Sequence, residues 1–263
     1  MDLHDYIDVA QNYDNYLSVM YGGVDKALLD FYSELAAGYG QGGVIDIACG
    51  TGAVLLHLAQ RGFDVDGTDL SEAMVDVSRK KAAGLGLSLN IFAGNMTDFT
   101  SARKYSLAII ARSGFMHLTT PGEQRKALLN IREHLLPGGI LTLNTFAPNI
   151  ELQYGQIKTS PDDYTFRLEY VNADGQREKI YNAISYDPVT QVMSGDWKFE
   201  TLGGDGEVIE TRIRPLKMRQ TYKTEMEYLI ELSGFEIVSV YGDYDRNPAS
   251  NGNLIWILRK IEN

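Results

Sequence analysis

A glycine-rich turn near the start of the chain links an apolar run to a predicted helix. The apolar run covers residues 44–48, the turn is Cys49-Gly50-Thr51-Gly52, and the helix is expected over 53–60. Such a turn lets a ligand approach the backbone and directs the N–H groups of the helix start toward it. Asp69, which ends a second apolar run, could accept two hydrogen bonds from a ribose. These residues favour a nucleoside-binding site over an ordinary tight turn with a surface aspartate.

Two classes of nucleoside cofactor suit this arrangement. A dinucleotide fingerprint carries a third glycine, in the pattern G-x-G-x-x-G, because the backbone must come close to a pyrophosphate. In this chain the third position is occupied by Leu55. The departure disfavours a dinucleotide, so an NAD-dependent oxidoreductase is kept only as an alternative.

Alternating strands and helices would position the turn. Apolar runs predict five strands, at residues 44–48, 64–69, 89–92, 106–110 and 140–144. Helices are expected between them, one after an N-cap at Ser71 and one after a capping box formed by Thr120 and Glu123. Strands that alternate with helices form a parallel sheet covered on both faces.

The sequence pattern changes after Pro148. Apolar and polar residues alternate from residue 164, and turn residues recur, so residues 164–216 predict an antiparallel sheet of about four strands. A capping box of Thr224 and Glu227 then starts a helix that ends at Gly234. Two further strands are expected after it, at residues 236–241 and 254–259.

These elements predict an α/β fold with an insertion. We expect a Rossmann-like, doubly wound, mostly parallel seven-stranded sheet with an inserted antiparallel β-sheet and an N-terminal helical arm. The arm is expected over residues 1–41, the core over 42–150 and 217–263, and the inserted sheet over 151–216.

Several segments together resemble the class I S-adenosylmethionine-dependent methyltransferases. Residues 46–52, Asp-Ile-Ala-Cys-Gly-Thr-Gly, resemble the first motif of that family, and residues 69–74 resemble the second. Residues 94–99 resemble its adenine-binding segment, and Leu-Leu-Pro-Gly-Gly at 135–139 resembles its turn before the fifth strand. The late helix with Ser-Gly-Phe at 233–235 and the two following strands resemble its final hairpin. The inserted sheet is similar to that of small-molecule members such as glycine and amino-sugar N-methyltransferases.

The resemblance implies S-adenosylmethionine as the cofactor. The first motif would hold its methionine part, Asp69 its ribose hydroxyls, and Asn95 and Met96 its adenine. The cofactor-binding residues that we carry over are Asp46, Ala48, Gly50, Gly52, Asp69, Leu70, Met74, Asn95, Met96, Ala111 and Arg112. The family usually has aspartate at the position of Asn95, and an asparagine oxygen could still accept from the exocyclic amine, without the charge.

Other residues are candidates for catalysis or acceptor binding. His117 could be a general base or a substrate contact, or it could pack beside the next helix. Tyr13 and Tyr21 could close over the cofactor, because aromatic faces attract a sulfonium, and Tyr13 joins His117 as a catalytic candidate. The predicted substrate contacts are Phe115, His117, Trp197, Arg212, Arg214, Tyr241 and Asp243. Core packing and solvated charge are the alternative interpretations.

Composition narrows the choice of partners. The 263 residues carry a formal net charge of −11, which disfavours binding to nucleic acid or to an anionic membrane surface. The single cysteine, Cys49, excludes an intrachain disulfide, and the four histidines have no metal-ligand spacing, so no metal is expected. The first residues lack the features of a signal peptide, and no apolar run is long enough to span a membrane, so we expect a cytoplasmic protein.

The function that we predict is methyl transfer from S-adenosylmethionine to a small molecule. Residues 1–41 hold seven acidic residues and one basic residue, and residues 151–216 hold twelve and seven. Acidic segments in the expected lid and substrate wall favour an amine-bearing acceptor, so nitrogen is placed ahead of oxygen. A non-catalytic cofactor-binding protein of the same fold stays open as an alternative, and so do a monomer and a homodimer.

Overall fold

The computed structural model describes residues 10–22, 25–157, 163–249 and 252–262. The chain divides into two compact units. One comprises residues 1–25 and 149–219, and the other comprises residues 26–148 and 220–263. We call them the antiparallel unit and the parallel unit, after the sheets on which they are built.

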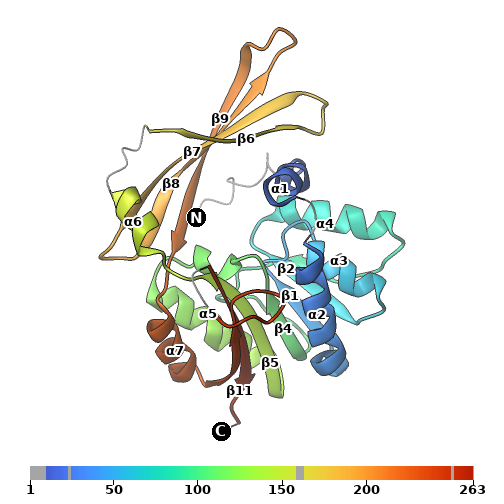
Figure 1. The fold of residues 1–263 in the computed structure, drawn as a ribbon. Coiled ribbons are helices and arrows are strands. Elements are labelled where there is room, and N and C mark those ends of the chain that lie inside the picture. The colour runs from blue at the N-terminus through green and yellow to red at the C-terminus, as the bar shows by residue number, and fades with distance from the viewer. Residues whose placement is uncertain (1–9, 23–24, 158–162, 250–251, 263) are drawn as a thin grey trace. The chain divides into compact units, whose positions relative to one another are not determined.

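The parallel unit contains a seven-stranded sheet in the order β10-β11-β5-β4-β1-β2-β3 (Figure 1). Strands β1 to β5 run parallel to one another, whereas β11 is antiparallel to both β5 and β10. The strands are β1 (Val44–Ile47), β2 (Val65–Asp69), β3 (Ile91–Ala93), β4 (Tyr105–Ile110), β5 (Leu135–Phe146), β10 (Phe235–Tyr241) and β11 (Asn253–Lys260). The predicted Rossmann-like, mostly parallel seven-stranded sheet is therefore confirmed.

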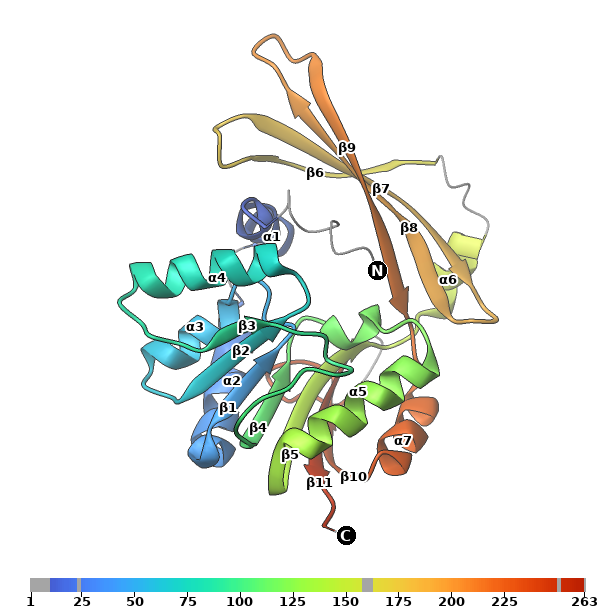
Figure 2. The same ribbon diagram turned by 180° about the vertical axis from the view of Figure 1, so that it is seen from behind.

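Helices cover both faces of this sheet (Figures 1 and 2). On one face lie α2 (Lys26–Tyr39), α3 (Ala53–Gln60) and α4 (Glu72–Gly84), and on the other lie α5 (Pro121–His134) and α7 (Lys223–Leu232). Two short 3-10 helices, η2 (Gly40–Gly42) and η3 (Gly114–His117), join strands to helices. Val44 of β1 belongs to the hydrophobic cluster under one helical layer, and Ile45 and Ile47 belong to the cluster under the other.

The N-terminal arm is shorter than the sequence predicted. Residues 26–41 lie in the parallel unit, where Phe31, Tyr32 and Leu35 of α2 are buried in the same hydrophobic cluster as Val44 of β1. Burial of this apolar face makes α2 a layer of the parallel unit.

Most helix starts follow their sequence signals. Ser71 caps α4 by accepting from the N–H of Met74 at 3.4 Å, and Thr120 and Glu123 form the expected capping box of α5. The predicted box at Thr224 is wrong, because α7 already begins at Lys223 after Tyr222. The Glu227 carboxylate, which the box requires, instead pairs with Lys223.

The antiparallel unit has a four-stranded sheet in the order β6-β7-β8-β9, as predicted. Its elements are α1 (Tyr13–Tyr21), α6 (Ile150–Ile157), β6 (Thr165–Val171), β7 (Arg177–Asp187), β8 (Val192–Leu202) and β9 (Val208–Arg219). Helix α1 packs on this sheet through Tyr16, whose ring meets the rings of Tyr170 and Phe199 edge-on. The backbone N–H of Ala173 donates to Oδ1 of Asn12 at 2.8 Å and adds a polar link between the arm and the sheet.

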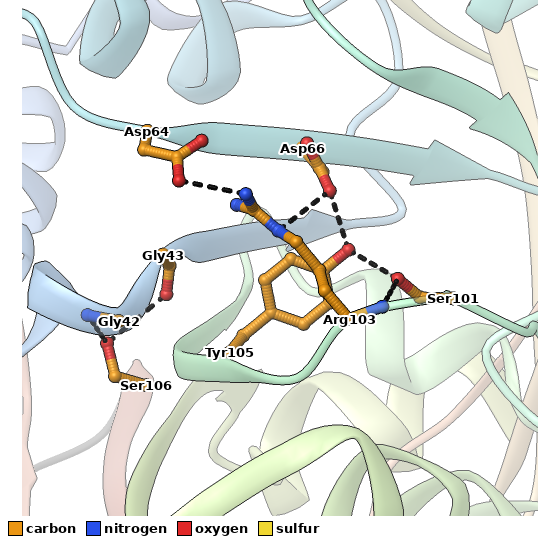
Figure 3. A network of polar contacts seen from close by, with 8 residues as sticks. All are labelled: Gly42, Gly43, Asp64, Asp66, Ser101, Arg103, Tyr105 and Ser106. Atoms are coloured by element: carbon orange, nitrogen blue, oxygen red, sulfur yellow. Dashed lines mark hydrogen bonds and ion pairs between the residues drawn. The ribbon is translucent and has the colours of Figure 1, made fainter.

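A polar network ties β2 to β4 on either side of β1 near the amino ends of these strands (Figure 3). The buried hydroxyl of Tyr105 donates to Oδ2 of Asp66 at 2.7 Å and lies 2.8 Å from Oγ of Ser101. Arg103 forms ion pairs with Asp66 at 3.2 Å and with Asp64 at 2.8 Å. Burial, together with the neighbouring Asp66 carboxylate, raises the pKa of Tyr105 to about 12. This network compensates the buried charge of Asp66 and stabilises the amino ends of β2 and β4.

The network predicts a stability effect for Tyr105. The Tyr105→Phe variant keeps the ring but removes the hydroxyl that donates to Asp66, so we expect the free energy of unfolding in urea to fall by about 1–3 kcal/mol. Tyr228→Phe is the matched control, because Tyr228 is 64% exposed, and we expect it to change by less than about 0.5 kcal/mol. Equal stability of the two variants would contradict a structural role for the network.

Candidate functional site

The loops that follow β1, β2 and β4 lie together at the end of the parallel sheet where these strands have their carboxyl ends. Strand β1 is parallel to β2 on one side and to β4 on the other, so the carboxyl ends of all three point the same way. In open α/β sheets this end is where ligands bind. The sequence-predicted cofactor residues of the parallel unit follow these strands or lie close to them in the chain.

The loop between β1 and α3 has an unusual backbone. Ala48, Gly50 and Gly52 all adopt positive φ, at 56°, 56° and 90°. A Cβ on Gly50 would meet no protein atom within 4 Å, whereas a Cβ on Gly52 would lie 2.5 Å from Oγ of Ser78. Gly52 therefore allows α3 and α4 to pack closely, and Gly50 exposes bare backbone to open space, as close approach of a ligand requires.

Asp69 connects this loop to the end of β2. Its Oδ2 accepts from the backbone N–H of Gly50 at 2.8 Å, and its Oδ1 accepts from the N–H of Ser71 at 2.9 Å. Burial raises the pKa of Asp69, and the two backbone hydrogen bonds oppose the rise. Because each carboxylate oxygen has two lone pairs, Asp69 can hold the loop and still accept from two ribose hydroxyls.

A second carboxyl group, that of Asp46, lies beneath the same loop. Asp46 is 1% exposed, its Oδ2 accepts from the N–H of Leu55 at 3.1 Å, and burial raises its pKa to about 8. Its Oδ1 has no hydrogen-bond partner among the described residues. Burial raises the pKa of Tyr32, which lies against Tyr244. Tyr244 and Asp46 raise this pKa further and Arg112 lowers it, so all three lie near the Tyr32 phenol.

Asn95 behaves differently from our expectation. Its Oδ1 accepts from both the backbone N–H and the hydroxyl of Thr97, each at 3.0 Å, and so closes the turn after β3. The amide oxygen is committed to the turn, so acceptance from an exocyclic amine is not supported, and the amide nitrogen is the atom left for a ligand. Met96 is partly buried, and its backbone oxygen accepts from Nδ2 of Asn130 at 3.3 Å.

The segment after β4 contains both site candidates and core. Ala111 is buried, and Arg112 and His117 are half-buried. The expectation that Phe115 contacts a substrate is wrong, because its side chain is fully buried in the hydrophobic cluster under α5. Of the other cofactor candidates, Leu70 is exposed directly after Asp69 and Met74 is buried in the first turn of α4.

The loop between β10 and β11 brings Tyr244 next to the site, although the sequence pointed instead to Tyr241 and Asp243. Asp243, predicted as a substrate contact, instead accepts from the N–H groups of Asp245 and Asn247 at 3.0 Å and from Nδ2 of Asn247 at 2.7 Å. Its carboxylate therefore shapes the loop. Tyr241 packs edge-on against Phe31 of α2. Tyr244 lies against Phe31 and Tyr32, where packing between distant segments puts it next to the site.

Three predicted substrate residues share one face of the antiparallel sheet. Trp197 of β8 is opposite Arg214 of β9, and Arg212 is two residues away along β9. Arg212 pairs with the buried carboxylate of Glu178, which also accepts from the hydroxyls of Tyr170 and Thr201. Arg214 lies over the ring of Phe199, 5.3 Å from its centroid. Arg212 therefore has a structural partner in Glu178.

Both tyrosines proposed to cover the cofactor belong to α1. The ring of Tyr13 meets that of Tyr16 edge-on, with centroids 5.3 Å apart. Tyr21 is the last residue of the helix, and its side chain lies outside the described part of the structure.

The described residues contain neither a membrane-spanning helix nor a cluster of metal-binding side chains. None of the helices resolved in these ranges combines the length and the apolar composition that crossing a membrane requires. Among the same residues, no group of three or more His, Cys, Asp or Glu side chains is arranged to hold a metal ion.

Comparison with known proteins relates this site to methyltransferases. Residues 44–139 match the family model described as a methyltransferase domain. A relative from Geobacillus sp. (strain WCH70), whose name assigns it to the methyltransferases, is 24% identical over 84% of this chain and 87% of its own length. The dTDP-3-amino-3,4,6-trideoxy-alpha-D-glucopyranose N,N-dimethyltransferase of Streptomyces venezuelae is 34% identical, over 38% of this chain and 40% of its own length. The fold is similar to that of an S-adenosylmethionine-dependent methyltransferase from Clostridium acetobutylicum, with a TM-score of 0.78, 16% identity and coverage of 98% and 99%.

Residues 44–139 are a methyltransferase domain, and the matches together support a class I S-adenosylmethionine-dependent methyltransferase. The matched residues begin with β1 and include the glycine loop, Asp69 and the turn after β4. The comparisons give no support to the oxidoreductase alternative.

The site of this methyltransferase fits its cofactor. S-adenosylmethionine supplies an electrophilic methyl group on a sulfonium. Open space faces Gly50, and Asp69 retains lone pairs for hydroxyl donors. The unpartnered Oδ1 of Asp46 is a buried polar atom that a polar group of a ligand can satisfy. Leaving it unsatisfied would cost free energy, so a ligand that pairs with it gains affinity.

The open space at Gly50 predicts a selective loss of cofactor binding. In Gly50→Ala the added methyl group meets no protein atom, so the free energy of unfolding should fall by only about 1–2 kcal/mol from the left-handed backbone. The methyl group would fill the space needed by the cofactor, so calorimetric titration with S-adenosylhomocysteine should show at least about tenfold weaker binding.

Gly62→Ala is the matched control for this test. Gly62 also has positive φ, at 84°, and open space around a Cβ, but it follows the carboxyl end of α3. We expect the same stability loss with unchanged binding of S-adenosylhomocysteine. Equal binding by both variants would refute the assignment of Gly50.

Proposed function

We propose that this methyltransferase acts on the nitrogen of a small amine, with amino sugars as the first class to test. The observation that carries the proposal is the similarity to the Streptomyces venezuelae amino-sugar N,N-dimethyltransferase. The inserted antiparallel sheet supports it, because by sequence this sheet resembles that of small-molecule members such as amino-sugar N-methyltransferases.

Methyl transfer to nitrogen sets definite requirements. Bound S-adenosylmethionine would supply a methyl group and take back the bonding electrons as a neutral thioether, so the residues around it would have to align the amine lone pair with that methyl carbon. Alignment and exclusion of water therefore supply much of the rate. An amine that is protonated at neutral pH has no free lone pair and must lose a proton before attack. We assign this step to His117, whose half-buried ring follows the turn after β4.

The acceptor contacts are proposed for the antiparallel unit. Trp197 and Arg214 lie on the sheet face where α1 packs, among the rings of Tyr16, Tyr170 and Phe199. Tyr13 of α1 is proposed to contribute an aromatic face toward the sulfonium. Arg212 is proposed to act through its pairing with Glu178 rather than as a free cation.

The acidic composition is a weaker support than the sequence suggested. Several acidic residues of the antiparallel unit are paired with bases within it, including Glu169 with Arg177 and Glu200 with Lys198. Paired carboxylates contribute little net attraction for an amine. The preference for nitrogen therefore rests mainly on the amino-sugar relative.

A direct assay tests the proposal. The enzyme is incubated with methyl-deuterated S-adenosylmethionine and a dTDP-linked amino sugar, and products are analysed by mass spectrometry. We expect one or two labelled methyl groups on the amine and none on the matched sugar that has a hydroxyl in place of the amine. Transfer only to the hydroxyl sugar would contradict the nitrogen assignment. Cofactor binding without transfer to any small amine would favour the non-catalytic alternative.

A further inference from the structure

The backbone is strained at the carboxyl end of β4. Arg112 and Ser113 are consecutive non-glycine residues with positive φ, at 50° and 61°. Each such conformation costs on the order of 1–3 kcal/mol and persists only where the surrounding structure enforces it. Because this turn precedes η3 and its His117, whatever enforces it also determines where these side chains lie.

Asn144 of β5 holds the strained turn. Its Oδ1 accepts from the backbone N–H of Ser113, and its Nδ2 donates to Oγ of Ser113, both at 2.9 Å. Asn144 is 3% exposed, so these bonds are shielded from water. The register explains the contact: Ile110, the last residue of β4, is opposite Leu143, so Asn144 is the next residue along β5 beside the turn.

Two further contacts restrict the same segment. Gly114 approaches the β1 loop so closely that a Cβ there would lie 3.0 Å from Cβ of Ala48. The backbone N–H of Phe146 donates to Sδ of Met116 at 3.2 Å. Strand β5 therefore contacts this segment at two points, and Asn144 is the residue that bonds directly to the strained backbone.

We propose that Asn144 is a positioning residue, which clamps Ser113 and thereby directs Arg112 toward the cofactor site and fixes the start of the turn that carries His117. Arg112 is close enough to Tyr32 to oppose the rise in the pKa of that phenol, and Tyr32 neighbours Asp46. The hydrogen bonds of Asn144 therefore also position the charge of Arg112 near Tyr32 and Asp46, beneath the glycine loop. This inference rests on the cofactor site described above.

The test measures binding of S-adenosylhomocysteine by calorimetry in a double-mutant cycle. Asn144→Ala should weaken binding about tenfold, because misplaced binding groups lose much of their effect. In an Arg112→Ala background, the same substitution should change the dissociation constant by less than about twofold, since the group that it positions is already gone. A merely structural role would weaken binding equally in both backgrounds.

Thr145→Val is the matched control on the same strand. It removes a buried hydrogen bond, from Nε1 of Trp256 to Oγ1 of Thr145 at 3.2 Å, that does not involve the turn. We expect it to lower the melting temperature without changing the dissociation constant. If it weakens binding as much as Asn144→Ala does, the proposal is overturned.

A milder variant covers the case in which Asn144→Ala does not fold. Ser113→Ala keeps the bond from the backbone N–H to Asn144 and removes only the Oγ acceptor, so it should weaken binding by a smaller factor, again only when Arg112 is present. If Asn144→Ala does not fold and Ser113→Ala binds S-adenosylhomocysteine as tightly as the wild type does, the proposal is also overturned. If the wild-type protein itself does not bind S-adenosylhomocysteine, the cofactor site fails, and that result is distinct from equal binding by wild type and Asn144→Ala.

Discussion

The bond from the backbone N–H of Gly50 to the carboxylate of Asp69 is the interaction on which the site depends. It ties the loop after β1 to the end of β2. The loop could not take this path without the left-handed backbone at Ala48, Gly50 and Gly52. Once the path is set, Gly50 faces open space, Asp69 can accept further hydrogen bonds, and Asp46 lies buried beneath both.

The carboxyl and amino ends of the parallel strands have different roles. At the carboxyl ends of the strands the backbone is strained at Ala48, Arg112 and Ser113, and the buried Oδ1 of Asp46 lacks a partner among the described residues. At the amino ends Tyr105, Asp66 and Arg103 satisfy one another. Strain and unsatisfied polar groups are costly, so they are retained where a ligand binds, and the satisfied network elsewhere helps to offset their cost.

The sequence predicted those features that depend on neighbouring residues. The strand, glycine turn and helix around Gly50, the cap at Ser71 and the capping box at Thr120 are local patterns, and each forms as expected. The final strands and the antiparallel sheet followed from periodicity and turn residues. The resemblance of these local motifs to a known family then predicted S-adenosylmethionine as the cofactor.

Other features could not be predicted because they depend on contacts between distant segments. Asn144 reaches Ser113, and Tyr244 reaches Tyr32, only after the sheet has formed. Phe115 lies beside candidate site residues in the chain, but the fold turns it into the core. Asp243 has the chemistry of a binding residue, yet its own loop uses its carboxylate. In each case the residue type was informative and the direction of the side chain was not.

The most direct test of this account is a crystal structure of the protein with S-adenosylhomocysteine bound. The account predicts that the ribose hydroxyls donate to Asp69 and that the methionine part lies in the open space facing Gly50, above Asp46. A ligand bound elsewhere, or a ribose that makes no hydrogen bond with Asp69, would contradict it.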